Sequence, residues 1–187
     1  IISFLLSFLI IKNLDVNFLL NTILVTSAIF LFFVTLKEFL SKKMANLSQN
    51  LTHFGFSLLI LSILFNNIFS TEIITNIKIG GSFNSEDLKI KFEDINQTNK
   101  KNFKSIVGKF RIENSKGETE YLNPELRIYN QPNIITSEAD IKTSWLTDKF
   151  MTMNSVQNQE FFNIRYQVKP FMLWIWISVL LMSFGGL

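Results

Sequence analysis

The sequence predicts an integral membrane α-helical protein with a small antiparallel β-rich domain, a sandwich or a partly open barrel, inserted outside the membrane. Three observations support this fold class. Apolar runs long enough to cross a bilayer lie towards both ends of the chain, about 100 residues between them carry alternating apolar and charged side chains, and the net charge of +3 comes from residues near the apolar runs. A mean hydropathy of +0.26 is too high for an ordinary soluble domain, but 18% charged residues are too many for a wholly embedded chain.

Residues 51–69 form the apolar run on which the prediction is centred. They contain no Asp, Glu, Lys or Arg, and a helix of this length rises about 28 Å, close to the ~30 Å of a bilayer core. Residues 17–36 form a second run of spanning length, 1–11 the end of a truncated helix, and 169–187 a C-terminal spanning helix. Because both ends of the sequence lie inside apolar runs, we expect the chain to be part of a longer membrane protein.

Charge sets the expected orientation of these helices. The loop 37–50 carries three lysines against one glutamate, which places it in the cytoplasm by the positive-inside rule. Residues 70–168 hold 13 basic and 13 acidic side chains, so this domain is neutral and no nucleic-acid-binding face is expected. It is predicted to lie in the periplasm, on the bacterial inner membrane, with the mitochondrial inner membrane as the alternative. Trp174 and Trp176 follow as an aromatic belt at the lipid bilayer surface.

Alternation of apolar and polar side chains predicts the strands of residues 70–168. The turn signal Asn114–Gly117, followed by 119–122, predicts a hairpin, and Gly80-Gly81 predicts a turn. A short helix is expected within Ala139–Met151. The clearest strands are 88–95, 109–113 and 163–168, and weaker ones are 73–79 and 125–129.

The absence of cysteine excludes disulfides, thiolate chemistry and Cys-ligated metals in this chain. Nucleotide-binding glycine loops, EF-hands and zinc-protease motifs are also missing, and one histidine at membrane depth cannot serve a Ser-His-Asp triad in the β-rich domain. That residue, His53, is the chemical candidate, because an ionisable group inside a span is costly unless it has a partner, and imidazole ligates haem iron. The alternative is an imidazole that is solvated at the interface or bonded to a neighbouring helix. Gly55 allows close approach of either a helix or a flat ligand.

Four motifs carry a resemblance to a known family. In order along the chain they are LTHFG at 51–55, PELRIY at 124–129, ITSEADI at 135–141, and VKPFMLWIW at 168–176 followed by MSFGG at 182–186. Together the motifs resemble the C-terminal part of the CcmF family, the haem lyase component of cytochrome c-type biogenesis. The resemblance covers about residues 44–187.

The resemblance implies a function and its partners. The family attaches haem, as the transferred substrate, to the CXXCH thiols of apocytochrome c. A CcmE-type haem chaperone delivers the haem, and a CcmH-type thiol partner takes part in presenting the apocytochrome. A Trp-rich WWD segment with flanking histidines holds this haem. A second, b-type haem lies in the membrane between histidines of two helices, and His53 matches one of these axial ligands, its only implied metal contact being the haem iron.

The sequence departs from the family pattern in ways that limit the resemblance. It has no WWD segment and no second membrane histidine, so an upstream portion or another polypeptide must supply the rest of either haem site. Whether this segment is itself enzymatic stays open, and no catalytic residue is assigned. Arg127, Tyr129 and Glu138 match family positions, and they are candidates for contacts with a partner or a haem propionate. The alternative, which the chemistry favours, is that Arg127 pairs with Glu138 within the fold.

Two other functions remain open at this point. One is a membrane-anchored extracytoplasmic binding or scaffold module without haem, in which His53 is merely interfacial. The other is a transporter subunit, which is disfavoured because the spans hold few buried polar groups.

Overall fold

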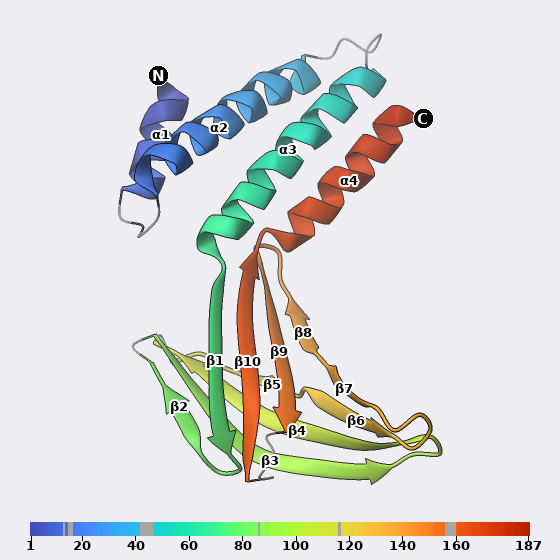
Figure 1. Ribbon diagram of the computed structural model, residues 1–187. Coiled ribbons are helices and arrows are strands. Elements are labelled where there is room, and N and C mark those ends of the chain that lie inside the picture. Colours follow the sequence, from blue (N-terminus) through green and yellow to red (C-terminus); the bar gives the residue numbers. More distant parts are fainter. Residues whose placement is uncertain (13, 15–16, 42–46, 86, 116, 156–159) are drawn as a thin grey trace. The chain divides into compact units, whose positions relative to one another are not determined.

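The computed structural model describes residues 1–12, 14, 17–41, 47–85, 87–115, 117–155 and 160–187 of the chain. The chain divides into two compact units, which Figure 1 draws as a set of helices and a set of strands. The helical unit comprises Ile1–Ser70, Ser144–Thr147 and Lys169–Leu187, and the β unit comprises Thr71–Thr143 and Asp148–Val168.

The helical unit contains α1 (Ile2–Ile11), α2 (Phe18–Leu40), α3 (Leu47–Phe69) and α4 (Met172–Gly186). Two of them, α2 and α3, are long and apolar enough to cross a membrane by length and composition, whereas α1 and α4 are shorter apolar helices. The predicted loop 37–50 is therefore too long, because no proline or glycine stops α2 before Leu40 and α3 already begins at Leu47. Residues 42–46 of that loop lie outside the described part of the chain.

Small side chains bring α3 and α4 together. An added Cβ on Gly55 of α3 would lie 2.9 Å from Cγ of Met182 and 3.0 Å from the carbonyl oxygen of Ser178. At the other end of the contact, Ser48 donates a hydrogen bond to the carbonyl oxygen of Gly185. These glycines let the two backbones approach more closely than larger side chains would allow.

Larger side chains and one polar pair form the contact between α2 and α3. Phe54 of α3 stacks on Phe39 with ring centroids 5.2 Å apart, and it also packs against Phe32 at 5.6 Å. The hydroxyls of Thr35 and Ser57 share a buried hydrogen bond of 2.6 Å. The hydroxyls of Thr22 and Thr35 also donate to carbonyl oxygens of α2 itself, as small polar side chains in apolar helices commonly do.

The β unit is an antiparallel sandwich of two sheets (Figure 1). One sheet has the strand order β1-β10-β9-β8, and the other has the order β2-β3-β4-β6-β7 with β5 beside β4. The bounds are β1 Thr71–Lys78, β2 Ser82–Asn84, β3 Leu88–Asn99, β4 Phe103–Asn114, β5 Thr119–Leu122, β6 Glu125–Tyr129, β7 Ile135–Glu138, β8 Asp140–Thr143, β9 Thr147–Ser155 and β10 Phe161–Pro170.

Side chains from both sheets fill the core of the sandwich. Phe92 and Phe110 are fully buried and stack with ring centroids 4.2 Å apart, and Phe162 from the other sheet meets Phe92 edge-on at 5.5 Å. These residues occupy the apolar positions of the alternating pattern, so the period-2 prediction identified the buried face correctly. The core cluster consists of Ile77, Ile90, Phe92, Phe110, Ile112, Leu122, Leu126, Met151, Met153, Phe162, Ile164 and Tyr166.

The expected short helix within Ala139–Met151 is wrong. This stretch forms the hairpin of β8 and β9, in which Asp140 pairs with Met151 and Thr143 with Asp148. The physical reason is burial on a strand period, because Met151 and Met153 both point into the core. Tertiary packing therefore overrides the local helix propensity of this segment.

A β-bulge interrupts β3. The pairing of β3 with β4 shifts between Phe92 and Asp94. On its other edge β3 pairs with β2 and then with Gly80 and Gly81, and Phe92 is the last residue of β3 bonded there. Beyond the bulge, the described residues 94–99 pair with β4 on one side only. Asp94 bends back, and its carboxylate accepts the Ile95 backbone N–H at 2.8 Å.

Candidate functional site

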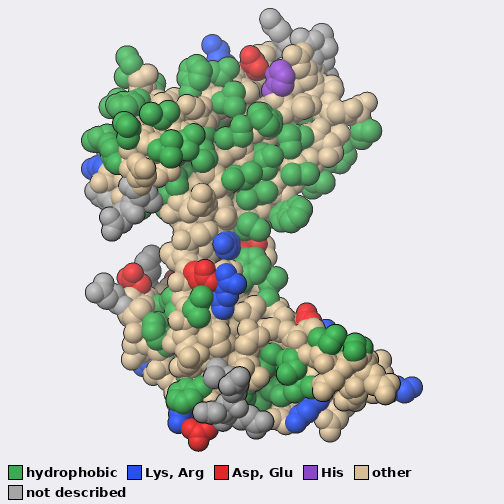
Figure 2. All heavy atoms as spheres, viewed as in Figure 1, with side chains coloured by type: hydrophobic (Ala, Val, Ile, Leu, Met, Phe, Trp, Pro, Cys, Tyr) green, Lys and Arg blue, Asp and Glu red, His purple; other side chains and the backbone are tan. Residues whose placement is uncertain are grey.

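His53 lies on a face of α3 that neither α2 nor α4 covers in the described chain. Gly55 of the same helix meets α4 and Phe54 meets α2, whereas His53 and Phe56 are exposed. A helix turns 100° per residue, so Phe56 and Ile60 extend the face of His53 along the helix axis. Figure 2 shows the imidazole (purple) at the surface, beside an acidic side chain (red), with exposed hydrophobic side chains (green) nearby.

The position of Gly55 resolves one alternative left by the sequence. The glycine faces Met182 and Ser178 of α4, so it serves helix packing. It lies about 160° around the helix from His53, given 100° per residue. Gly55 therefore does not make room for a ligand on the imidazole's own face.

The chemistry of His53 fits one axial ligand of a haem iron. An exposed imidazole that is followed along its helix face by the apolar residues Phe56 and Ile60 offers a ring nitrogen to a metal in surroundings that suit a porphyrin. The chain contains no other histidine, and the described residues form no group of three or more metal-ligating side chains. The fit is therefore to half of a bis-histidine site.

Arg127 lies in an ion-pair cluster on one face of the β4-β6-β7 part of the sheet. One of its guanidinium nitrogens is 2.8 Å from a carboxylate oxygen of Glu125, and the other is 3.7 Å from one of Glu138. Buried Ser105 donates to the second oxygen of Glu125 at 2.5 Å. Tyr129 packs against Phe103 with ring centroids 5.2 Å apart.

The electrostatics of this cluster follow from its hydrogen bonds. The Arg127 guanidinium, and secondarily the Ser105 hydroxyl, lower the pKa of the Glu125 carboxyl. The bond to Glu125 and the contact with Tyr129 raise the pKa of Arg127, so this side chain is a permanent cation. Both partners are therefore charged near neutral pH, and Arg127 remains one-third exposed.

The structure thus brings Arg127, Tyr129 and Glu138 onto adjacent strands, while His53 belongs to the other unit. The pairing of Arg127 with Glu138, which the sequence left as an alternative, is present. The closer partner, Glu125, was missed. It lies two residues before Arg127 and so on the same face of a strand, which is the signal that predicts the pair.

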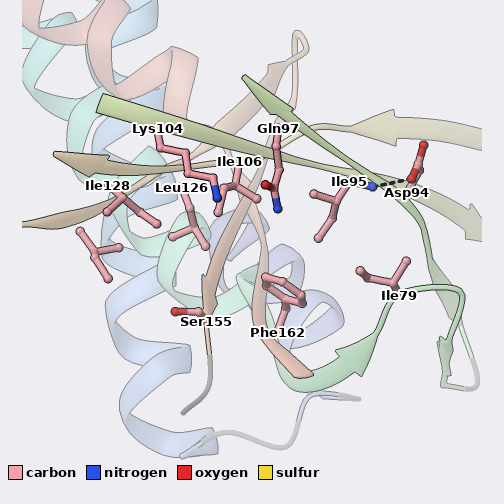
Figure 3. A pocket seen from close by; sticks show the side chains of 11 residues that line it. Ile79, Asp94, Ile95, Gln97, Lys104, Ile106, Leu126, Ile128, Ser155 and Phe162 are labelled. Atoms are coloured by element: carbon pink, nitrogen blue, oxygen red, sulfur yellow. Dashed lines mark hydrogen bonds between the residues drawn. The ribbon is translucent and has the colours of Figure 1, made fainter. Parts of the chain in front are cut away.

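A cavity of about 590 Å³ opens between the sheets of the β unit. Residues of β3, β4 and β6 line one side, and Ile79, Ser155 and Phe162 face them (Figure 3). The walls are mainly apolar, with Lys104, Gln97 and Asp94 as the longer polar groups. A volume in this range suits a small ligand or a few side chains of a partner. Sequence periodicity did not predict this space.

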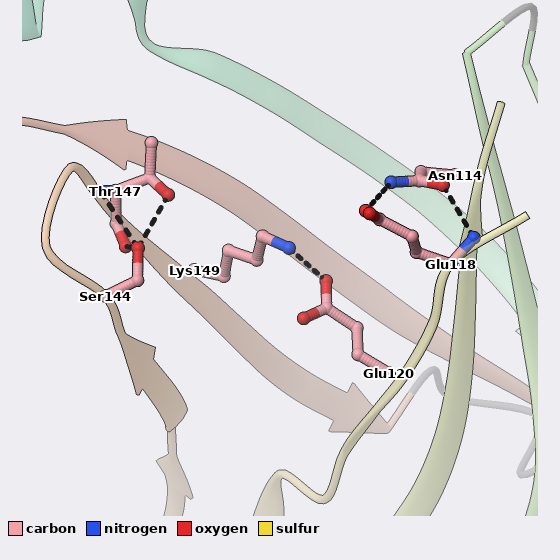
Figure 4. Close-up of polar contacts among 6 residues, drawn as sticks. All are labelled: Asn114, Glu118, Glu120, Ser144, Thr147 and Lys149. Atoms are coloured by element: carbon pink, nitrogen blue, oxygen red, sulfur yellow. Dashed lines mark hydrogen bonds and ion pairs between the residues drawn. The ribbon is translucent and has the colours of Figure 1, made fainter. Parts of the chain in front are cut away.

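An ion pair links the two sheets on the inner side of the sandwich. Lys149 of β9 is 2.5 Å from a carboxylate oxygen of Glu120 of β5 (Figure 4). Burial, and secondarily the charge of Glu120, raise the pKa of Tyr166, which keeps the phenol neutral.

The turn between β4 and β5 has its own polar contacts. In Figure 4 the Asn114 side chain bonds to Glu118, at 2.7 Å between the two side chains and at 2.9 Å to the Glu118 backbone N–H. The two Asn114–Glu118 bonds close the β4–β5 hairpin, and they have no evident catalytic use.

Comparison with known proteins adds a family to this geometry. The family model described as the CcmF C-terminal beta-sandwich matches residues 68–170, more than half of the chain. The cytochrome c-type biogenesis protein CcmF of Haemophilus influenzae is 32% identical over 139 residues, which cover 73% of this chain and 21% of that protein. CcmF of Escherichia coli is 26% identical over 135 residues, covering 72% and 21%. The chain spans about a fifth of the length of these curated relatives.

A solved structure shares the fold. The cytochrome c haem lyase CcmF superposes with a TM-score of 0.70 over 98% of this chain and 32% of its own, at 14% sequence identity. At that identity the superposition bears on the fold alone. It includes both the helices and the sandwich, because it covers nearly the whole chain.

Proposed function

Because the chain belongs to the CcmF family, we propose that it is part of a haem lyase of c-type cytochrome maturation. In this proposal haem delivered by a CcmE-type chaperone is attached to the CXXCH thiols of apocytochrome c, with a CcmH-type thiol partner. The sandwich is a docking domain for these proteins. The WWD segment expected to handle the substrate haem is absent from this sequence, so residues 1–187 support that site from outside it.

We further propose that His53 is one axial ligand of a b-type haem. The observation that supports it is the exposed imidazole on a face of α3 that α2 and α4 leave free. Haem bound there supplies one-electron chemistry. The role of the chain is to hold the imidazole by packing the other two faces of α3, through Gly55 against α4 and Phe54 against α2.

The proposed location is a bacterial inner membrane, with the β unit in the periplasm. The lengths and apolar composition of α2 and α3 support it. Lys37 in the last turn of α2 is on the side predicted to be cytoplasmic, where cationic residues are favoured. The expectation that no nucleic acid binds follows from the neutral charge of residues 70–168.

The test is a visible spectrum of the purified full-length protein. We expect His53→Ala to remove the low-spin b-type bands and to lower the haem content, while the protein still accumulates in the membrane. Asn67→Ala is the matched control, because Asn67 is an exposed polar residue on the same side of α3. Unchanged bands in His53→Ala would refute the ligand role, and a wild-type protein without haem would favour the scaffold alternative.

A further inference from the structure

The tip of the β8–β9 hairpin, Ser144–Thr147, presents two large apolar side chains outward. Trp145 is 68% exposed and Leu146 is 56% exposed. The turn itself is tightly closed, because Ser144 donates its backbone N–H to the Thr147 carbonyl oxygen at 3.0 Å and its hydroxyl to the same oxygen at 2.7 Å (Figure 4). Turns are ordinarily polar, so an exposed Trp-Leu pair here calls for an apolar environment.

The first turn of α4 holds the backbone of this tip. The backbone N–H of Phe171 donates to the Leu146 carbonyl oxygen at 2.7 Å, and the Trp174 indole N–H donates to the Trp145 carbonyl oxygen at 3.0 Å. The two indole rings meet edge-on with centroids 5.7 Å apart. The tip accordingly groups with the helices rather than with the β unit.

These contacts satisfy the carbonyls of the tip but leave its side chains free. The Trp145 indole N–H has no hydrogen-bond partner among the residues that the structure describes, and it needs one in a polar setting. Lys142 precedes Trp145 by three residues, and Lys169 precedes Phe171 by two. Tryptophan beside lysine is the composition that favours the headgroup layer of a bilayer, where the ring is in apolar surroundings and its N–H is hydrated.

We propose that the Trp145–Leu146 tip is a membrane anchor that lies in the phospholipid headgroup layer beside the start of α4. The occupant of this surface is lipid, because the tip is bonded to the first turn of α4, and α4 itself exposes a stripe of large apolar side chains formed by Trp176, Leu180 and Phe184. The inference rests on the proposed membrane location of the helices. It extends the aromatic belt of Trp174 and Trp176 by a residue that belongs to a different part of the sequence.

The experiment measures the depth of a spin label in nanodiscs of phosphatidylcholine and phosphatidylglycerol. Cysteine is absent from this chain, so Leu146→Cys can carry the label after any cysteines elsewhere in the full-length protein are replaced. Ile134→Cys, an exposed apolar position of the β unit, is the matched aqueous control, and Leu180→Cys and Phe30→Cys report the helices. The readout is the ratio of collision rates with oxygen and with a water-soluble nickel chelate.

We expect the ratio at Leu146 to exceed that at Ile134 several-fold and to fall below the ratios at Leu180 and Phe30. A ratio at Leu146 equal to that at Ile134, with lipid-like values at Leu180 and Phe30, would overturn the anchor alone. Low accessibility of Leu146 to both reagents would overturn it in favour of a protein occupant. Water-like ratios at Leu180 and Phe30 would overturn the membrane premise itself, while the haem spectrum of the His53 variant tests the ligand role separately.

Discussion

The two units bury their large side chains in opposite ways. In the β unit, Phe92 and Phe110 are completely inaccessible, and both sheets contribute to one continuous core. In the helical unit, Phe30 is 62% exposed and Phe56 is 52% exposed, and the buried apolar cluster of the described helices is small, formed by Ile11, Val25 and Ile29. The β unit therefore supplies its own apolar interior, whereas the helices require lipid or further protein around them.

This difference also appears in how neighbouring elements meet. The sheets contact each other through large rings and methionines, so their attraction comes from apolar area removed from water. The contact of α3 with α4 uses glycine and serine, so its strength comes from close backbone approach. The first kind of contact is sensitive to deletion of side-chain volume, and the second to its addition.

The largest effect is expected from Phe110→Ala. It removes a buried ring stacked on Phe92 and leaves a cavity, which costs about 3–5 kcal/mol of unfolding free energy. Hydrogen exchange of the full-length protein, read on peptides of β4 and β10, measures the loss. Phe56→Ala on the exposed face of α3 is the control, and equal effects of the two substitutions on those peptides would break the contrast between the units.

Added volume should disturb the helical unit by a smaller amount. Gly55→Leu places a side chain where even a Cβ would lie 2.9 Å from Met182, and we expect a loss of about 1–3 kcal/mol. Thermal unfolding followed by circular dichroism at the helix band measures it in detergent. Phe56→Leu, one residue along on the exposed face, controls for local helix effects, and a Gly55→Leu protein as stable as this control would contradict the packing role.

The smallest effect concerns pH and is confined to the β unit. The pKa of Glu125 is lowered in the folded state, so its bonds stabilise the fold above the unfolded glutamate pKa of about 4.3 and this stability is lost as pH falls through the lowered value. We therefore expect Glu125→Gln to be less stable at pH 7 and to lose less stability on acidification, measured by denaturant unfolding from pH 7 to 3.

Glu160→Gln is the matched control for that titration. Lys78 lowers the pKa of Glu160, but this carboxylate is mostly exposed and solvent screens its ion pair. The acid dependence should therefore change less than for Glu125→Gln. A larger change in the Glu160 variant would show that surface charge, rather than the Ser105–Glu125–Arg127 bonds, sets the acid sensitivity.

Much of the fold was predictable wherever a segment repeats one pattern along its whole length. The predicted strands 88–95 and 109–113 lie within β3 and β4, because each alternates between a core face and an outer face. The segment Ala139–Met151 was mispredicted because its short strands gain their stability from pairing, which local sequence does not encode. Likewise, the cavity exists only where two sheets diverge, and no single strand predicts it.

The candidate residues show the same limit. A lone histidine in a span was enough to select His53, and the pairing of Arg127 with Glu138 followed from motif positions. The free face of α3 could not be read from the sequence, because it depends on which neighbours the helix contacts. Trp145 was assigned to a helix and so was not associated with Trp174, and only the hairpin brings the two rings together.

The bulge in β3 has a consequence for how the β unit avoids aggregation while it folds. Past Phe92, β3 pairs only with β4 among the described residues. The backbone N–H and C=O groups on its other edge could therefore pair with a strand of another chain. Residues 96–101 there read Asn-Gln-Thr-Asn-Lys-Lys, without an apolar side chain, and Asp94 caps the first free N–H. A polar, cationic rim of this kind disfavours edge-to-edge aggregation, and Ile95 is the one apolar residue that β3 carries beyond the bulge.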